Sequence, residues 1–152
     1  MTDIDHTYRM KIDWLADREG VARAEGLPGL HVGAPPEFGG RSGVWTPEHL
    51  LVGAVASCFL TTFLAVAELS GLPLVTVEVP AEGSLARGED RRYRFERVTL
   101  RPRILLAGEE DRERARRLVD KAEAACLVTR SLATEVVVEP VLEVSVGEPA
   151  VA

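Results

Sequence analysis

Apolar and polar side chains alternate over residues 7–14, with the apolar positions occupied by Tyr8, Met10, Ile12 and Trp14. A period of two is typical of a strand that has one buried face. The charged segment 17–20 predicts a turn, and residues 21–25 predict a weaker partner strand. Residues 27–45 are rich in proline and glycine, which predicts a long loop of the kind that often carries function.

A long helix is predicted to follow this loop and to end near Ser70. Thr46 supplies a hydroxyl cap, Pro47 fits the first helical position, and Glu48 places an acid in the first turn. Residues 50–67 carry no charge. A helix of that length spans only about 27 Å, at the lower limit for a membrane crossing. We therefore interpret it as a core helix that is buried on all sides.

The second half of the chain predicts a β-hairpin, an amphipathic helix and a last strand. The hairpin strands are expected at 74–85 and 91–105, with a bulge near 96–97 where the apolar phase shifts. An acidic first turn opens a helix that ends at Cys126 and has apolar residues on one face. Residues 134–146 alternate as a final strand. The expected fold is α+β, with a mostly antiparallel sheet packed against two helices in a single domain, residues 1–152.

Composition and charge narrow the class of protein. A chain of 152 residues with 46% hydrophobic and 28% charged residues has the profile of an ordinary globular domain. Two cysteines are too few for a secreted disulfide framework. The net charge of −6 argues against nucleic acid or an anionic membrane as the partner. The first residues show no apolar leader, so we expect a cytoplasmic location.

The two cysteines are the main candidates for chemistry. Cys58 lies midway along the predicted central helix, and Cys126 ends the amphipathic one. Free cysteine is often only a small buried hydrophobe, so packing alone is the alternative interpretation. The cysteines and histidines lack metal-ligand spacing, and the sequence has no phosphate-binding glycine motif, so we expect neither a metal nor a cofactor.

Three segments of the chain resemble the OsmC/Ohr family of osmotically inducible and organic hydroperoxide resistance proteins. Residues 39–59 contain Pro-Glu followed by an apolar helix with a cysteine ten residues after the glutamate. Residues 122–132 resemble the segment around the family's second cysteine, although Leu127 stands where the family often has proline. Residues 17–20 resemble the turn that carries the family's arginine.

The resemblance implies a thiol-dependent peroxidase that forms an intertwined homodimer. Cys58 would be the nucleophile, Cys126 the resolving cysteine, and Arg18 with Glu48 the activating pair, with Arg41 a rival to Arg18. The implied substrates are organic hydroperoxides, with hydrogen peroxide left open. An external thiol or dithiol, with a lipoyl-type dithiol as one candidate, would reduce the resulting disulfide.

Elementary chemistry agrees with these implied roles. An apolar helix raises the pKa of a cysteine, and a guanidinium nearby lowers it again. Glu48 and Cys58 lie ten residues apart on one helix, about 15 Å along its axis and roughly 80° apart around it. Two antiparallel copies crossing near Gly53 would bring Glu48 of one chain to Cys58 of the other. A non-catalytic dimer, which binds a small ligand or is purely structural, remains the alternative.

Overall fold

The computed structural model describes residues 2–146. Its residues form two compact units, unit 1 up to Leu51 and unit 2 from Val52 onward. The boundary falls within the long helix α1 (Pro47–Ser70). The single-domain organisation of residues 1–152 stays a prediction.

Unit 1 contains a three-stranded antiparallel sheet in the order β1-β2-β3. Its strands are β1 (Lys11–Ala16), β2 (Glu19–Arg23) and β3 (Leu30–Gly33), followed by the short 3-10 helix η1 (Pro36–Phe38). The prediction of an unstructured loop over 27–45 was therefore wrong, because β3 pairs along β2 within it. Its four residues are too few for a periodic signal to stand out between the flanking prolines and glycines.

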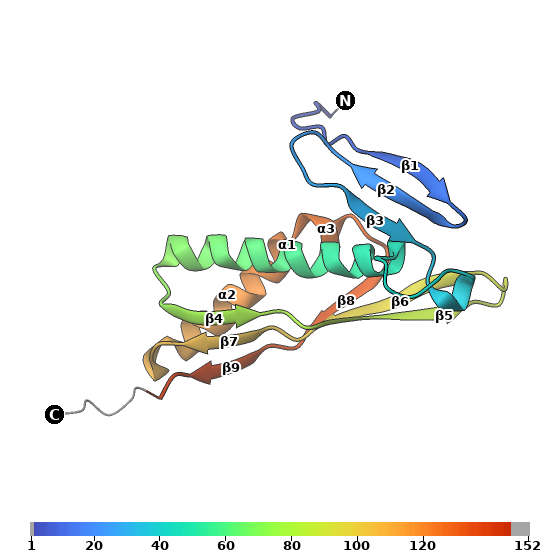
Figure 1. Cartoon of the computed structure of the whole chain (residues 1–152). Helices are drawn as coiled ribbons and strands as arrows, with labels where there is room; N and C mark the ends of the chain where they lie inside the picture. Colours follow the sequence, from blue (N-terminus) through green and yellow to red (C-terminus); the bar gives the residue numbers. More distant parts are fainter. Residues whose placement is uncertain (1, 147–152) are drawn as a thin grey trace. The chain divides into compact units, whose positions relative to one another are not determined.

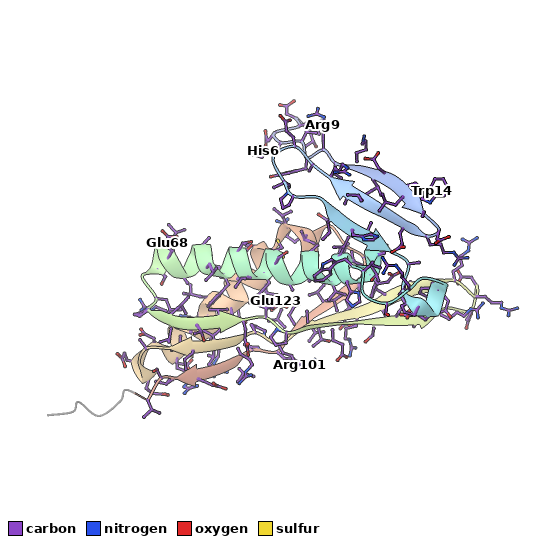
Figure 2. The ribbon with its side chains drawn as sticks, in the orientation of Figure 1. His6, Arg9, Trp14, Glu68, Arg101 and Glu123 are labelled. Atoms are coloured by element: carbon purple, nitrogen blue, oxygen red, sulfur yellow. The ribbon has the colours of Figure 1, made fainter. Side chains whose placement is uncertain are left out.

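The first strand begins later than predicted, and its apolar side chains are not half-buried within one chain. The four alternating positions are all exposed: Tyr8 93%, Met10 65%, Ile12 55% and Trp14 79%. Trp14 projects from β1 in Figure 2, and its indole nitrogen donates to the Asp17 carbonyl oxygen at 3.1 Å. The alternation is that of a strand, but residues 2–146 leave its apolar side chains exposed.

Helix α1 begins and ends where the sequence predicts. The Thr46 hydroxyl accepts the His49 backbone N–H at 3.1 Å, which caps the first turn. Gly71, at a φ of 66°, ends the helix in the left-handed conformation. The helix has the length and hydropathy of a membrane span. A helix in the core of a soluble protein can have the same length and hydropathy.

The expectation that α1 is buried on all sides was wrong for a single chain. Its buried residues form one stripe that repeats every fourth position: Val55, Phe59, Phe63 and Ala67. That stripe belongs to the core of unit 2. Leu64 and Leu69 on other faces are exposed, as is Gly53. The uncharged run therefore keeps apolar surface that the described part of the chain leaves exposed.

Unit 2 contains two ladders of three strands each, and α1 extends along both (Figure 1). The strands are β4 (Leu74–Glu78), β5 (Ala81–Arg87), β6 (Tyr93–Leu100), β7 (Arg103–Leu106), β8 (Glu135–Val138) and β9 (Val141–Val144). One ladder has the order β4-β7-β9 and the other β5-β6-β8. Each combines one antiparallel with one parallel pair.

The predicted long strands are each divided once, and a proline lies at every division. Pro80 separates β4 from β5, Pro102 separates β6 from β7, and Pro140 separates β8 from β9. Proline has no N–H to donate to a ladder, so regular pairing stops at its position. The expected bulge is confirmed, because Arg97 pairs with Ser84 and Phe95 with Leu85, which leaves Glu96 as the extra residue.

The helices of unit 2 complete its core. The 3-10 turn η2 (Glu109–Asp111) leads into α2 (Arg112–Ala125), and α3 (Leu127–Arg130) follows Cys126 directly. The predicted amphipathic helix is confirmed as α2, whereas α3 was not predicted. The apolar face of α2 packs with α1 and both ladders through Ala115, Leu118, Val119 and Ala122. The fold is α+β, as predicted: the sheet of unit 1 is antiparallel, and each ladder of unit 2 combines one antiparallel with one parallel pair.

Candidate functional site

Unit 2 brings the two cysteines into contact although 67 residues separate them. Cys58 lies on α1 and is half-buried, while Cys126 lies between α2 and α3 and is 1% exposed. Both are free thiols, and the nearness of Cys126 is among the causes that lower the pKa of Cys58. The two thiols are therefore neighbours within unit 2.

The surroundings of Cys58 favour its ionised form. Burial raises the pKa of the Cys58 thiol, but hydrogen bonds outweigh this and lower it overall. The donors are the backbone N–H groups of Val128 and Leu127, the Cys126 thiol and the Thr62 hydroxyl. A thiolate is the nucleophilic form of cysteine, so a lowered pKa makes Cys58 more reactive at neutral pH than a cysteine with the ordinary pKa.

Cys126 has a hydroxyl partner of its own. The Thr129 hydroxyl donates to the Cys126 sulfur at 3.4 Å from the first turn of α3. The backbone at Cys126 is extended, with φ −64° and ψ 107°, and it separates α2 from α3. The thiol is thus fixed at the junction of two helices.

Arg18 is positioned by the turn between β1 and β2 in unit 1. Asp17, at a φ of 46°, turns the chain, and the guanidinium of Arg18 donates to the Phe38 carbonyl oxygen. Gly39 also contacts that guanidinium, because a Cβ at this position would overlap it. Arg18 is therefore fixed against the segment that follows η1.

Glu48 lies in the first turn of α1 and lines the same cavity of unit 1 as Arg18. The cavity has a volume of about 500 Å³ and is mainly apolar, with Ile12, Trp14 and Phe38 among its walls. The Glu48 Oε2 atom is buried and has no hydrogen-bond partner among the described residues. Buried carboxylate oxygens are nearly always hydrogen-bonded, so this unpartnered oxygen marks Glu48 as a candidate functional residue.

Arg41, the rival to Arg18, is held by a different carboxylate. Its Nε atom lies 2.7 Å from Glu19 Oε1, and His31 Nε2 lies 3.1 Å from the same oxygen. The hydrogen bond and charge of Arg41 hold the pKa of the Glu19 carboxyl below its usual range, against the opposing effect of burial. Glu19 was not among the site residues predicted from the sequence. It lies on β2 and pairs with Gly33 of β3.

The structure therefore brings the predicted site residues together in two pairs. Cys58 and Cys126 are in contact in unit 2, and Arg18 and Glu48 share a cavity in unit 1, without an ion pair between them among the described residues. No cluster of histidine, cysteine or carboxylate residues within 2–146 has the makeup of a metal site. The hydroxyl and backbone donors to Cys58 were not foreseen from the sequence.

The long helix, the two mixed ladders and the neighbouring pair of thiols together indicate a class of small α+β proteins with two free cysteines. The family model described as OsmC-like protein matches residues 40–141, and the chain belongs to this family. It is 28% identical over 149 residues to the uncharacterised protein YmaD of Bacillus subtilis, covering 94% of this chain and 97% of that one.

Solved structures share the fold over nearly the whole chain. An organic hydroperoxide resistance protein OsmC from Legionella pneumophila is 29% identical, with a TM-score of 0.71, and covers 95% of this chain and 100% of its own. An OsmC-like protein of unknown function from Vibrio cholerae has a TM-score of 0.83 at 19% identity, covering 90% of this chain and 100% of its own. The OsmC/Ohr resemblance drawn from the sequence is thus confirmed.

Proposed function

We propose that this protein is a thiol-dependent peroxidase that reduces organic hydroperoxides, with Cys58 as the nucleophile and Cys126 as the resolving thiol. The observation that carries the proposal is the contact between the two sulfurs together with the lowered pKa of Cys58. The name of the Legionella relative, an organic hydroperoxide resistance protein, supports the substrate class.

The chemistry proceeds in two steps. The Cys58 thiolate attacks one oxygen of the hydroperoxide, the O–O bond breaks, and the other oxygen leaves as an alkoxide that takes up a proton to become the alcohol. Cys58 is left as a sulfenic acid. The Cys126 sulfur then attacks the Cys58 sulfur, a disulfide forms, and hydroxide leaves with a proton as water. An external dithiol returns two electrons and restores both thiols.

Arg18 and Glu48 are proposed as the activating pair. A guanidinium stays charged at all working pH values and stabilises a thiolate, and a carboxylate can hold it by a bidentate pair. The buried and unpartnered Glu48 oxygen in the cavity shared with Arg18 supports this role. The apolar lining of the cavity suits the organic part of a hydroperoxide.

We also propose that the working form is a homodimer in which each site takes Glu48 from one chain and the cysteines from the other. Glu48 and Cys58 leave α1 ten residues apart on different faces. The uncovered apolar faces of β1 and α1 support a second copy as their cover. Residues 1–152 would then act as one OsmC-like domain, since the family match crosses the boundary between the units. We propose that this domain works in the cytoplasm.

The test is thiol titration before and after one equivalent of cumene hydroperoxide, followed by turnover with dihydrolipoamide or a monothiol. We expect the loss of both thiols as an intramolecular disulfide, release of cumyl alcohol, and faster turnover with cumene hydroperoxide than with hydrogen peroxide. Retention of both thiols after exposure to either peroxide would refute the peroxidase and favour a ligand-binding dimer.

A further inference from the structure

A compact turn over residues 34–40, which we call the η1 turn, follows β3 in unit 1. Three backbone N–H groups within it donate to the carbonyl oxygens of Pro35 and Pro36 at distances between 2.9 and 3.1 Å. A Cβ at Gly40 would overlap the Ala34 carbonyl oxygen, so the two ends of the turn are in direct backbone contact. Because its ends touch and its middle is hydrogen-bonded, displacement of one end is expected to move the whole turn.

The η1 turn is attached to the start of β2 at three points. At its beginning, the Ala34 N–H donates to the Arg18 carbonyl oxygen at 3.1 Å. In its middle, the Phe38 carbonyl oxygen accepts the Arg18 guanidinium. Directly after its end, Arg41 Nε lies 2.7 Å from Glu19 Oε1. Two adjacent residues, Arg18 and Glu19, thus receive all three contacts.

The carboxylate of Glu19 lies in a niche of the fold. Its side chain is only 14% exposed, and His31 Nε2 lies 3.1 Å from the oxygen that Arg41 contacts. Gly33 pairs with Glu19 across the sheet, and a Cβ there would lie 3.1 Å from the Glu19 Cγ, so the missing side chain leaves room for the carboxylate. Removing one partner of a largely buried charge is more costly than breaking a fully exposed pair. Loss of Arg41 should therefore weaken the attachment of the η1 turn measurably.

The guanidinium of Arg18 lies beside open space. It borders a cavity of about 510 Å³ that Arg41, Gly39 and Gly40 also line. A long side chain next to such space keeps one conformation only where a contact offsets its rotamer entropy. The Phe38 carbonyl oxygen supplies such a contact for Arg18, and its place is set by the η1 turn.

We propose that Arg41 is a positioning residue for Arg18: its ion pair with Glu19 closes the η1 turn against β2 and keeps the Phe38 carbonyl oxygen on the Arg18 guanidinium. The two arginines then have different tasks, one in the activating pair and one in holding the turn. The part of Arg41 in catalysis rests on the proposed function, whereas the closure of the turn is a property of unit 1 alone.

Hydrogen exchange tests the closure of the turn without any peroxide. Arg41→Gln and Glu19→Gln remove the charge from either side of the pair in the full-length reduced protein, and mass spectrometry follows peptides that contain residues 34–40. We expect their N–H groups to exchange about fivefold faster in both variants, a factor on the scale of one partly exposed ion pair. Arg41→Lys, which keeps the charge, should recover most of the protection. Wild-type exchange in both glutamine variants would refute the closure.

Arg23→Gln is the matched control. Arg23 lies at the other end of β2 from Glu19, and its Nε atom is 3.3 Å from Asp13 Oδ2, so the variant removes a comparable ion pair from the same sheet. It should leave the exchange of residues 34–40 at the wild-type rate. Equal acceleration in Arg23→Gln and Arg41→Gln would refute a specific role for Arg41.

A double-mutant cycle tests whether Arg41 acts through Arg18. Arg41→Gln should lower kcat/KM for cumene hydroperoxide about fivefold, again with recovery in Arg41→Lys. In the Arg18→Lys background the same change should have little further effect, because the side chain that the turn positions is already absent. Additive losses would show that Arg41 acts independently of Arg18 and would overturn the positioning role.

The outcomes also separate this proposal from the proposed function. If exchange accelerates in Arg41→Gln but the wild type consumes no cumene hydroperoxide, the closure of the turn stands, and the peroxidase falls together with the catalytic use of that closure. If the wild type consumes peroxide but Arg41→Gln changes neither the exchange nor kcat/KM, the peroxidase stands and the positioning role is refuted.

Discussion

Thr129 donates a hydrogen bond to the sulfur of Cys126 from three residues further along the chain, at 3.4 Å. A side-chain hydrogen bond fixes the orientation of this sulfur, which must attack the Cys58 sulfenic acid to form the disulfide. We therefore expect Thr129→Val to slow disulfide formation by several-fold, because the Cys126 sulfur is then held less firmly in position. Dimedone trapping of the Cys58 sulfenic acid after one equivalent of cumene hydroperoxide measures its lifetime. Thr129→Ser should behave like the wild type, and a wild-type lifetime in Thr129→Val would contradict the role.

Replacement of each cysteine by serine is expected to impair peroxide reduction in a different way. Cys58→Ser should abolish peroxide consumption, because no other thiol is placed to attack the O–O bond. Cys126→Ser should consume one equivalent and then accumulate sulfinic acid on Cys58, because a sulfenic acid that meets no thiol is open to further oxidation. Mass spectrometry after stepwise addition of peroxide distinguishes the two. Full multiple turnover by Cys58→Ser would overturn the assignment.

Arg18 and Arg41 can be separated by the same conservative change. Arg18→Lys should lower kcat/KM for cumene hydroperoxide by at least tenfold, because an ammonium cannot form a planar bidentate pair with a carboxylate. Arg41→Lys should cost much less, since Arg41 lies against Glu19 rather than Glu48. The reverse order of effects would make Arg41 the activating residue.

The stability of the reduced protein should depend on pH through Cys58. Its pKa is lower in the folded chain than in the unfolded one, so the unfolded chain binds more protons between the two values. The stabilisation is therefore full above the unfolded pKa and is lost as the pH falls through the folded pKa. Urea unfolding with excess reductant, compared with Cys58→Ser across this window, should show a slope that the variant lacks. Parallel pH profiles would exclude a lowered pKa.

The shared-site dimer can be tested by mixing two inactive chains. Glu48→Ala and Cys58→Ser each damage both sites of a homodimer, but a heterodimer of the two contains one intact site. Co-refolded mixtures should therefore recover activity, up to one working site per heterodimer. Verified heterodimers without activity would defeat the shared site, and a monomer at micromolar concentration in sedimentation would defeat the dimer itself.

The features predicted most accurately from the sequence are those that depend on neighbouring residues alone, such as helix ends and a β-bulge. Both ends of α1 were predictable because Thr46 and Gly71 terminate a helix by their own chemistry. The bulge at Glu96 showed itself as a shift in apolar phase. The division of the last strand was missed although Pro140 lies within it, since the alternation on either side continued unbroken.

The donors to Cys58 depend on contacts that no local pattern contains. The spacing of Thr62 from Cys58 is visible in the sequence, but a helical threonine usually bonds its own backbone, as Thr61 does. The N–H groups of Leu127 and Val128 carry no side-chain signature at all. The exposure of β1 was also unpredictable, because an alternating pattern indicates that a face is apolar and not which chain covers it.

The three prolines that divide the strands of unit 2 leave the pairing register unchanged from one ladder to the other. Ala81 pairs with Leu100 and Glu78 with Arg103 in one continuous register, and Leu100 with Val138 and Arg103 with Val141 in another. In a continuous sheet, inserting or deleting one residue turns every later side chain of that strand to the opposite face. Here Pro80, Pro102 and Pro140 interrupt all three strands at corresponding positions, and Arg101, labelled in Figure 2, bridges the interruption through Glu139 at 3.1 Å. Because the register continues across the prolines, a change of length in β5, β6 or β8 would shift the pairing of both ladders. It would also turn the apolar face of β4-β7-β9 away from α1, so the lengths of the two halves are constrained together.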